Sequence, residues 1–374
     1  MSIHARQSEY PRERFTQHTT VQTAFHRKRM NVQQIADELM SIFRYPGGRC
    51  AHRLLQGFAN LTYVEGARLL AGEPSPKLRS VGLWGLGRCH NETSDSSSAV
   101  LLPDGRIMEQ RDLYLEALSL DPHNAFTYNG VAFTLKGKET VTLPDGRTLT
   151  SIQLYLESLK LLEHPLFFCN IGVMMSDGES VEIHDGRQMT QRQLYLESLA
   201  RGTNTFAYNN LACVMEDDET VQLLDGRVLN RRQLYLNSIA CDNTYASAYF
   251  NLGRALNDSE TIDLLDGRHM TKTQLFQTAI HHNPKFSNAL TSLGFLLSRT
   301  ETITLLDGRT LNQRQLYLEA LKHEPRYAVA LNNLATTLVD NETVSFPDGR
   351  EFNETSLYLE AIKCDPKSVI CFLS

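Results

Sequence analysis

The chain has 374 residues, of which 41% are hydrophobic, 8% aromatic and 21% charged, a composition typical of a folded globular protein with a substantial core. Its formal net charge is -6 at pH 7, which leaves no basic stripe for binding a phosphate backbone, so we expect no nucleic-acid partner. The sequence has no apolar run of about eighteen residues and predicts no membrane-spanning helix. Its seven cysteines include no C-x-x-C pair, which favours a reducing, cytoplasmic compartment.

The first 76 residues differ in character from the rest of the chain. Residues 1–31 are basic and lack the apolar stretch of a signal peptide, so we expect a flexible tail. A transit peptide is the alternative, although Glu9 and Glu13 interrupt its basic character. Residues 32–76 predict two helices separated by a Tyr-Pro-Gly-Gly turn, and we expect them to cap the end of the following array.

Residues 77–374 contain a repeated unit. The tripeptide Asp-Gly-Arg occurs seven times, with intervals of 41, 40, 40, 41, 41 and 41 residues, beginning at Asp104 and ending at Asp348. Each copy is followed by a block similar to Leu-Tyr-Leu-Glu. Such regularity predicts an array in which each unit buries its apolar face against its neighbours.

The first part of each unit predicts a helix, which we name helix A. In the unit 243–283, residues 245–256 place apolar side chains at helical spacing along one wide face. Gly253 lies within this face, where the missing side chain would let a neighbouring helix approach closely. Gly294 and Ala335 take the same place in later units.

The middle of each unit predicts a small β-hairpin. Ile262 and Leu264 alternate with polar residues and are followed by Asp-Gly, a strong hairpin signal in which both turn residues are expected at positive φ. The arginine after each glycine predicts either a comb of cations for an acidic partner or, as we favour, a local pair with an acidic residue such as Glu260 or Asp266.

The last part of each unit predicts a second helix, helix B. Its start carries a Thr or Asn three residues before Gln, the pattern of a capping box in which two backbone amides are satisfied reciprocally. Proline follows the end of several copies and blocks further helix. The predicted capping pairs are Thr150 with Gln153, Thr190 with Gln193, Asn230 with Gln233, Thr271 with Gln274, and Asn312 with Gln315.

This layout resembles the tetratricopeptide repeat, whose signature runs W-x2-L-G-x2-Y, A-x3-F and P. Tyr249, Leu252 and Gly253 match its first helix, and Phe276 and Pro284 match its second. The usual unit has about 34 residues, and the inserted hairpin accounts for the extra length here. The resemblance implies an all-α, right-handed solenoid of about seven helix pairs, each with an inserted hairpin, that acts as a protein-interaction scaffold.

Asparagines recur in helix A, which lines the concave groove in proteins of this family. An amide side chain can donate to a peptide carbonyl and accept from a peptide N–H, so a column of them could hold an extended peptide or a partner helix. The alternative is that they serve local packing. Gly130 and Ser292 interrupt the column. The predicted groove residues are Asn129, Asn170, Asn210, Asn251, Arg254, Asn332 and Asn333, with Arg254 as a possible anchor for an acidic partner.

The sequence around Cys371 supports two different hypotheses. Residues 371–374 fit a C-a-a-X pattern for farnesylation, which would make the protein a membrane-associated adaptor. Residues 367–374 also match the first turns of an eighth helix A. In that case the C-a-a-X pattern arises from the repeat and does not indicate prenylation of Cys371. We expect membrane association only if Cys371 is prenylated.

The sequence predicts no catalytic function. It contains no phosphate-binding loop, dinucleotide fingerprint or nucleophile elbow, and the pair His281-His282 has no third ligand at metal spacing. We therefore expect no enzyme activity, no cofactor and no metal, and a protein or peptide as the partner.

Overall fold

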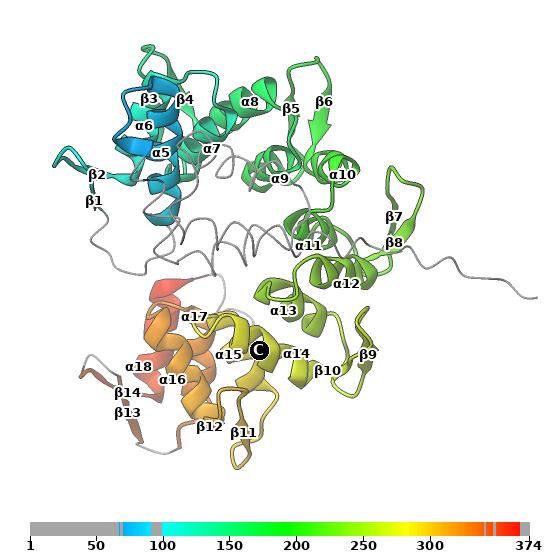
Figure 1. The fold of residues 1–374 in the computed structure, drawn as a ribbon. Coiled ribbons are helices and arrows are strands. Elements are labelled where there is room, and N and C mark those ends of the chain that lie inside the picture. The colour runs from blue at the N-terminus through cyan, green and yellow to red at the C-terminus, as the bar shows by residue number, and fades with distance from the viewer. Residues whose placement is uncertain (1–66, 68–69, 91–98, 340–341, 347–348, 367–374) are drawn as a thin grey trace, which may run out of the picture. The chain divides into compact units, whose positions relative to one another are not determined.

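The computed structural model describes residues 67, 70–90, 99–339, 342–346 and 349–366, and these form helix pairs in series (Figure 1). Helix A of the successive repeats is α5 (Pro76–His90), α7 (Ala125–Phe133), α9 (Pro165–Met174), α11 (Thr205–Cys213), α13 (Ala246–Arg254), α15 (Ser287–Phe295) and α17 (Ala328–Ala335). Helix B is α6 (Gln110–Leu120), α8 (Ser151–Leu161), α10 (Gln191–Arg201), α12 (Arg231–Cys241), α14 (Lys272–His282), α16 (Gln313–His323) and α18 (Glu354–Cys364).

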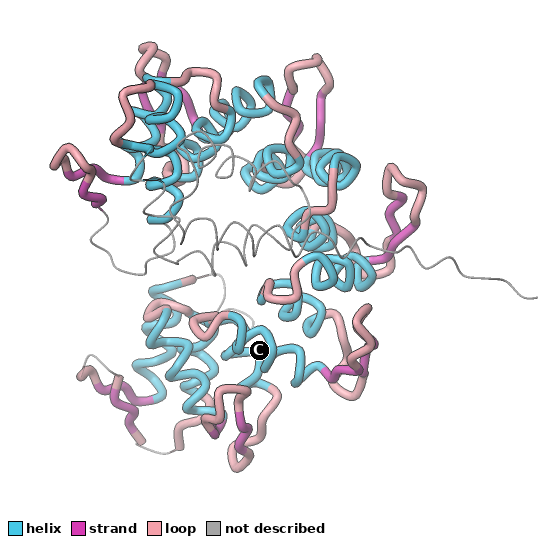
Figure 2. Tube along the Cα trace, in the orientation of Figure 1, coloured by secondary structure: helices cyan, strands magenta, loops and turns pink. Residues whose placement is uncertain are grey.

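A two-stranded antiparallel hairpin joins helix A to helix B in every repeat of the described chain, so the predicted combination of helix pair and inserted hairpin is confirmed (Figure 2). No strand in these described hairpins pairs with a strand of another repeat. The strands are β1 (Ala99–Leu101) and β2 (Ile107–Glu109), β3 (Thr140–Thr142) and β4 (Thr148–Thr150), β5 (Ser180–Glu182) and β6 (Gln188–Thr190), β7 (Thr220–Gln222) and β8 (Val228–Asn230), β9 (Thr261–Asp263) and β10 (His269–Thr271), β11 (Thr302–Thr304) and β12 (Thr310–Asn312), and β13 (Thr343–Ser345) and β14 (Glu351–Asn353).

The chain divides into two compact units, which we describe separately. The first unit comprises residues 1–174 and 181–188 and contains helices α5 to α9 among its described residues. The second unit comprises residues 175–180 and 189–374 and contains α10 to α18.

Helix B begins with the predicted capping box in five repeats, and a sixth is present at Asn353, where Ser356 takes the place of Gln. In α14, for example, Gln274 N donates to Thr271 Oγ1 at 3.2 Å, and Thr271 N donates to Gln274 Oε1 at 2.9 Å. The first repeat differs, because Glu109 at the same place makes no side-chain cap. A cap of this type contributes about 1 kcal/mol, so the sequence itself fixes where the hairpin ends and helix B begins.

The close approach of the two helices depends on the predicted small residue in helix A. A Cβ atom at Gly253 would lie 2.7 Å from Cε1 of Phe276, and one at Gly294 would lie 2.7 Å from Cε1 of Tyr317. Both aromatic rings are buried at 1% exposure. The aromatic side chain of helix B therefore occupies the space that the glycine of helix A leaves free.

The turn of the hairpin differs from the predicted two-residue type. Gly267 N donates to Leu264 O at 2.9 Å and Leu264 N donates to Arg268 O at 2.8 Å, so three residues form the loop. Such a loop is a β-turn followed by a residue in the left-handed region, and here the glycine has φ +88°. The expectation that both residues of Asp-Gly need positive φ was wrong, because the aspartate lies inside the turn and its side chain accepts from the backbone of Arg268 at 3.1 Å.

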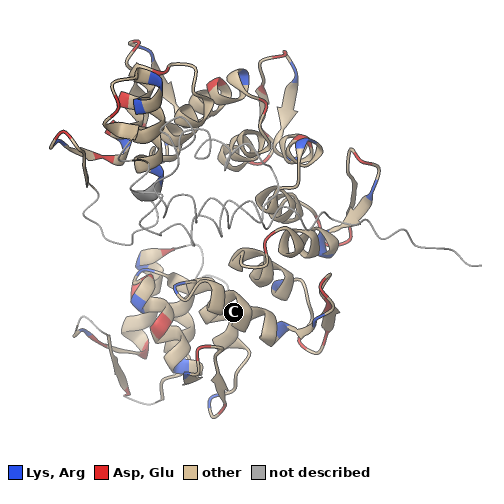
Figure 3. Ribbon diagram, viewed as in Figure 1, with Lys and Arg blue, Asp and Glu red and all other residues tan. Residues whose placement is uncertain are grey.

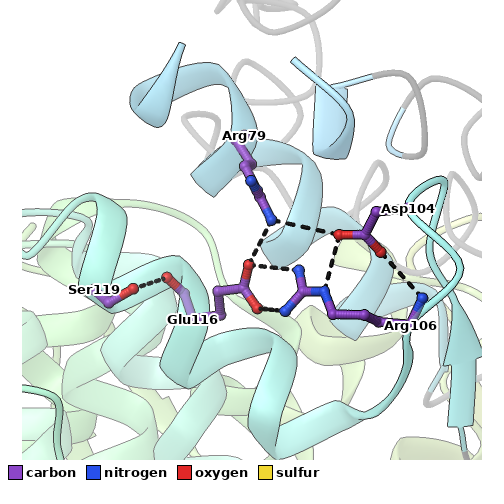
Figure 4. A network of polar contacts seen from close by, with 5 residues as sticks. All are labelled: Arg79, Asp104, Arg106, Glu116 and Ser119. Carbon is purple, nitrogen blue, oxygen red and sulfur yellow. Dashed lines mark hydrogen bonds and ion pairs between the residues drawn. The ribbon is translucent and has the colours of Figure 1, made fainter. Parts of the chain in front are cut away.

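The hairpin arginine makes local pairs, as we favoured. In the first repeat, Arg106 Nε donates to Asp104 Oδ2 at 2.9 Å and Arg106 Nη1 to Glu116 Oε2 at 2.7 Å, while Arg79 from α5 donates to Glu116 Oε1 at 2.9 Å (Figure 4). The hydrogen bond from Arg106 holds the pKa of Glu116 below its usual value. This network connects helix A, the hairpin and helix B of one repeat.

Glu260 has a different partner from the one expected. It accepts from Arg232 on helix B of the preceding repeat, and from the backbone N–H of Asn257 at 3.1 Å. Arg314 and Glu342 form the same pair two repeat boundaries later in the second unit, with Arg314 Nη2 at 2.9 Å from Glu342 Oε2. We name this contact the inter-repeat clasp. It fastens helix B of one repeat to the loop after helix A of the next.

The predicted tail, residues 1–31, and most of the predicted cap, residues 32–76, lie outside the described residues. At the described edge, backbone atoms of Ala67, Leu70 and Ala71 lie directly against Gly82 of α5, where a Cβ atom would be 2.2 Å from Ala71 N. Leu70 and Ala71 are buried. The capping role of residues 32–76 stays a prediction.

Candidate peptide-binding site

The helix A asparagines pair with one another across neighbouring repeats. In the first unit, Asn170 Nδ2 donates to Asn129 Oδ1 at 2.7 Å, and in the second unit, Asn251 Nδ2 donates to Asn209 Oδ1 at 2.9 Å. Asn129 and Asn209 are buried. In each pair, one side-chain amide donor is therefore used within the protein. Among the described residues, the Oδ1 atoms of Asn170 and Asn251 accept no hydrogen bond.

The other predicted asparagines have different surroundings. Asn210 Oδ1 accepts from Asn209 Nδ2 at 3.0 Å. Asn333 is buried, and Asn332 is buried with neither side-chain polar atom hydrogen-bonded. The structure therefore spreads the predicted column over two kinds of position, one buried between repeats and one partly exposed.

Two of the predicted groove residues, Asn251 and Arg254, line a cavity of about 650 Å³ within the second unit. We name it the arginine pocket. It lies between the fourth and fifth repeats, and its walls come from the loop after α11, the start of α12 and the end of α13. Its lining residues are Asp217, Asp218, Asn230, Arg231, Arg232, Tyr235, Asn251, Arg254, Ala255, Leu256 and Asn257.

The arginines of this pocket are engaged to different degrees. Arg231 is paired with the highly exposed Asp217, but its Nε atom is buried without a hydrogen-bond partner. Arg232 belongs to the inter-repeat clasp with Glu260. Arg254 is exposed and, within the described part of the chain, has no hydrogen bond or ion pair; its guanidinium carbon lies 5.8 Å from the ring centroid of Phe250.

Tyr235 forms the apolar and neutral part of the pocket wall. Burial raises the pKa of its hydroxyl, so the group stays protonated at neutral pH. The hydroxyl lies 3.6 Å from Cys213 Sγ, and Asn251 Nδ2 lies 3.5 Å from the same sulfur. Arg231 and Tyr235 were missed in the sequence, because they lie at the start of helix B and reach the pocket only when the next repeat packs beside them.

Exposed apolar side chains were also missed. Phe133, Val173 and Phe295 occupy the same helix A position as Arg254 and are 62%, 54% and 70% exposed. Helix A thus presents a surface on which large apolar groups lie one repeat apart from Arg254 or from each other. Aligning the repeats and reading the position after the small residue would have found this set.

The helix pairs, the glycine that lies against the helix B aromatic ring in repeats such as those of Gly253 and Gly294, and the serial packing decide the fold. The chain is a tetratricopeptide-like repeat protein. No known family's sequence profile matches it, and no curated protein is similar to it in sequence.

Several solved structures are distantly similar to this tetratricopeptide-like chain. Yeast Tom70 is 16% identical over 74% of this chain and 51% of its own, with a TM-score of 0.39, so this chain spans about half the length of Tom70. A human IFIT1 dimer with PPP-AAAA is 11% identical over 91% of this chain and 88% of its own, with a TM-score of 0.35. A human IFIT1 dimer with m7Gppp-AAAA is 12% identical over 86% and 58%, with a TM-score of 0.34. At this distance the similarity says nothing about partners.

The remaining sequence predictions concern membranes. No helix within the described residues is long and apolar enough to cross a bilayer. Cys371 lies outside the described residues, so prenylation stays a hypothesis.

Proposed function

We propose that the chain is a protein-interaction scaffold whose second unit binds an extended peptide along helix A, with an acidic side chain of the peptide at Arg254. The observation that carries this proposal is the arginine pocket, in which an unpaired guanidinium lies beside an asparagine carbonyl that accepts no hydrogen bond within the described structure. A guanidinium can bind a carboxylate through two parallel hydrogen bonds.

The neighbouring residues support a peptide as the occupant. Asn251 keeps its Oδ1 atom available for a peptide N–H, while its Nδ2 atom is fixed by Asn209. Phe295, one repeat further on, offers an exposed aromatic surface for an apolar side chain. We therefore expect a motif in which an acidic residue precedes or follows an apolar one in an extended segment.

The charges around the pocket set limits on this partner. Asp217 and Asp218 lie on its wall beside the three arginines, so a strongly acidic ligand meets repulsion as well as attraction. Figure 3 shows that charged residues of both signs are also spread over the hairpins. We expect recognition of one carboxylate rather than of a long acidic run.

The test is affinity selection of a displayed random-peptide library on the full chain, followed by fluorescence polarisation with the selected peptides. We expect Arg254→Gln to weaken binding about tenfold and Asn251→Ala about threefold, as loss of a charged and a neutral hydrogen bond respectively. Arg309→Gln is the matched control, because Arg309 is a hairpin arginine already paired with Asp307 and Glu319.

Two results would reject the proposed site. Selected peptides that bind Arg254→Gln as tightly as the original chain would place recognition elsewhere. RNA binding that falls steeply with salt and needs Arg254 would show that the ligand is a nucleic acid, contrary to our expectation from the net charge.

A further inference from the structure

Each Asp-Gly-Arg hairpin contains a pair of residues that is chemically weak in a protein backbone. An aspartate before a glycine is prone to conversion to isoaspartate, because glycine has no side chain to keep the aspartate carboxyl group away from the glycine nitrogen. The hairpin nevertheless needs its glycine, whose φ lies between +83° and +89° in the seven repeats. The geometry that builds the hairpin therefore repeats a chemical weakness along the array.

The reaction is a ring closure, which we follow at Asp307 and Gly308 of the sixth repeat. The Gly308 nitrogen attacks the side-chain carboxyl carbon of Asp307, a carbon–nitrogen bond forms, and the carboxyl hydroxyl group leaves with the amide proton as water. Water then opens the resulting succinimide ring at either carbonyl carbon and yields aspartate or isoaspartate. The reaction consumes no other reactant.

Burial does not prevent this reaction. The side chain of Asp307 is 42% exposed, and that of Arg309 is 41% exposed. A Cβ atom at Gly308 would meet no atom within 4 Å. Water therefore reaches the turn, and no packed side chain holds it in place, so its protection depends on hydrogen bonds.

The hydrogen bonds of the turn oppose each requirement of the ring closure. Gly308 N donates to Leu305 O at 3.0 Å, so the proton that the nitrogen must lose is held by a carbonyl. Asp307 Oδ1 accepts from Arg309 N at 3.0 Å and Oδ2 accepts from Arg309 Nε at 2.8 Å, which holds the carboxyl group toward Arg309. These two bonds also keep the pKa of Asp307 below its ordinary value, and the carboxylate is a far weaker electrophile than the neutral acid.

The arginine side chain is the part of this arrangement that the sequence can vary. The two backbone N–H groups come with almost any residue, whereas a guanidinium adds a charge-assisted donor to the carboxylate. Arg309 is itself held by Glu319 of α16, since Arg309 Nη1 donates to Glu319 Oε1 at 3.1 Å. The Nε bond recurs at 2.7–2.9 Å in the other hairpins with a described aspartate, from Arg106 to Asp104, Arg147 to Asp145, Arg187 to Asp185, Arg227 to Asp225 and Arg268 to Asp266.

We propose that in these hairpins the arginine protects the aspartate of the Asp-Gly-Arg tripeptide from conversion to isoaspartate. Isoaspartate would add one carbon atom to the backbone of the turn. The hydrogen bond from Leu305 N to Arg309 O that closes the loop, at 2.8 Å, would then no longer fit. The hairpin joins helix A to helix B, so its loss would disturb the repeat. This role of the arginine is independent of the proposed peptide site.

The experiment is prolonged incubation of the full chain at physiological temperature and pH, followed by digestion and mass spectrometry. Electron-transfer fragmentation distinguishes isoaspartate from aspartate in each peptide, although the two have equal mass. We expect Asp307 in the folded chain to convert at least about thirtyfold more slowly than in the urea-unfolded chain, because the bonds of the turn must open first. Arg309→Met should raise the rate at Asp307 about tenfold in the folded chain, as the loss of a charged hydrogen bond implies.

The controls separate a local effect from a general loss of stability. Glu319→Gln removes the ion pair of Arg309 with α16 but leaves the bonds to Asp307, so the rate at Asp307 should stay within about twofold of the original. Asp225 and Asp266 in the Arg309→Met chain should keep their original rates. An unchanged rate at Asp307 in Arg309→Met would overturn the proposal, as would equal rates in the folded and unfolded original chains. An equal rise at Asp225 and Asp266 would also overturn it, because opening of the whole unit would then be the cause.

Discussion

Arg268 and Tyr249 join the hairpin of the fifth repeat to its helix A: Arg268 Nη2 donates to the Tyr249 hydroxyl at 2.9 Å. The same hydroxyl donates to the carbonyl of Asn243 at 3.1 Å, in the loop that leads into α13. The fourth repeat has the same bond, from Arg227 to Tyr208 at 2.9 Å. The hairpins are therefore tied to the helices by side chains that the repeat itself supplies.

Removing the hydrogen bond between Arg268 and Tyr249 should destabilise the second unit. We expect a double-mutant cycle of Arg268→Met and Tyr249→Phe to give a coupling energy of about 0.5–1.5 kcal/mol in denaturant unfolding. Arg309 serves as the control, because Leu290 takes the place of the tyrosine in its repeat. A cycle of Arg309→Met with Tyr249→Phe should be additive, and equal coupling in both cycles would contradict the assigned bond.

The ion pair of the inter-repeat clasp can be introduced between the fifth and sixth repeats, where the sequence lacks its arginine. Thr273 of α14 occupies the position of Arg232 and Arg314, and Glu301 occupies that of their partners Glu260 and Glu342. We expect Thr273→Arg to stabilise the second unit by about 0.5 kcal/mol, as a partly exposed ion pair does. Thr273→Gln is the control of similar helix propensity without charge, and it should gain less. If Thr273→Arg is no more stable than Thr273→Gln, the ion pair of the clasp adds nothing to the free energy of unfolding.

The clasps predict a dependence of stability on pH. Arg192 of α10 pairs with Glu219 in a third clasp. The arginine partners hold the pKa values of Glu219, Glu260 and Glu342 below the usual value of 4.5. Their stabilising contribution is therefore complete above pH 4.5 and is lost as pH falls through the lowered values. Denaturant midpoints between pH 7 and pH 3 should fall less steeply for a variant with all three residues changed to Gln. An unchanged slope would mean that these pairs do not titrate with folding.

Two glycines of the sixth repeat should be destabilised by substitution to alanine for different physical reasons. Gly294→Ala should cost about 1–3 kcal/mol, because its Cβ would lie 2.7 Å from the Tyr317 ring. Gly308→Ala meets no atom within 4 Å but sits at φ +89°, so its cost of about 1–2 kcal/mol is backbone strain. Only the first cost should shrink when Tyr317 is changed to Leu, which unfolding of the double variants would test.

The sequence by itself determined the repeat, the helix pairs, the hairpins and the helix B caps, because these depend on residues within one repeat. A Thr or Asn at the end of the hairpin and a Gln three positions later form the capping box in five repeats. The small residue of helix A predicts close packing against the neighbouring helix. The turn type was predicted wrongly for a local reason as well, since Asp-Gly serves both two-residue and three-residue loops.

Only the tertiary structure decided which surfaces remain available. Whether Glu260 pairs with Arg268 or Arg232, and whether an asparagine faces a neighbour or the solvent, depends on how one repeat packs against the next. Asn129 and Asn251 were both predicted to line the groove, yet one is buried as an acceptor and the other lines a pocket with Arg254. The physical reason is that a hydrogen bond or a cavity between repeats needs atoms far apart in the chain, 28 residues for Arg232 and Glu260 and 42 for Asn251 and Asn209, and no local pattern specifies their distance.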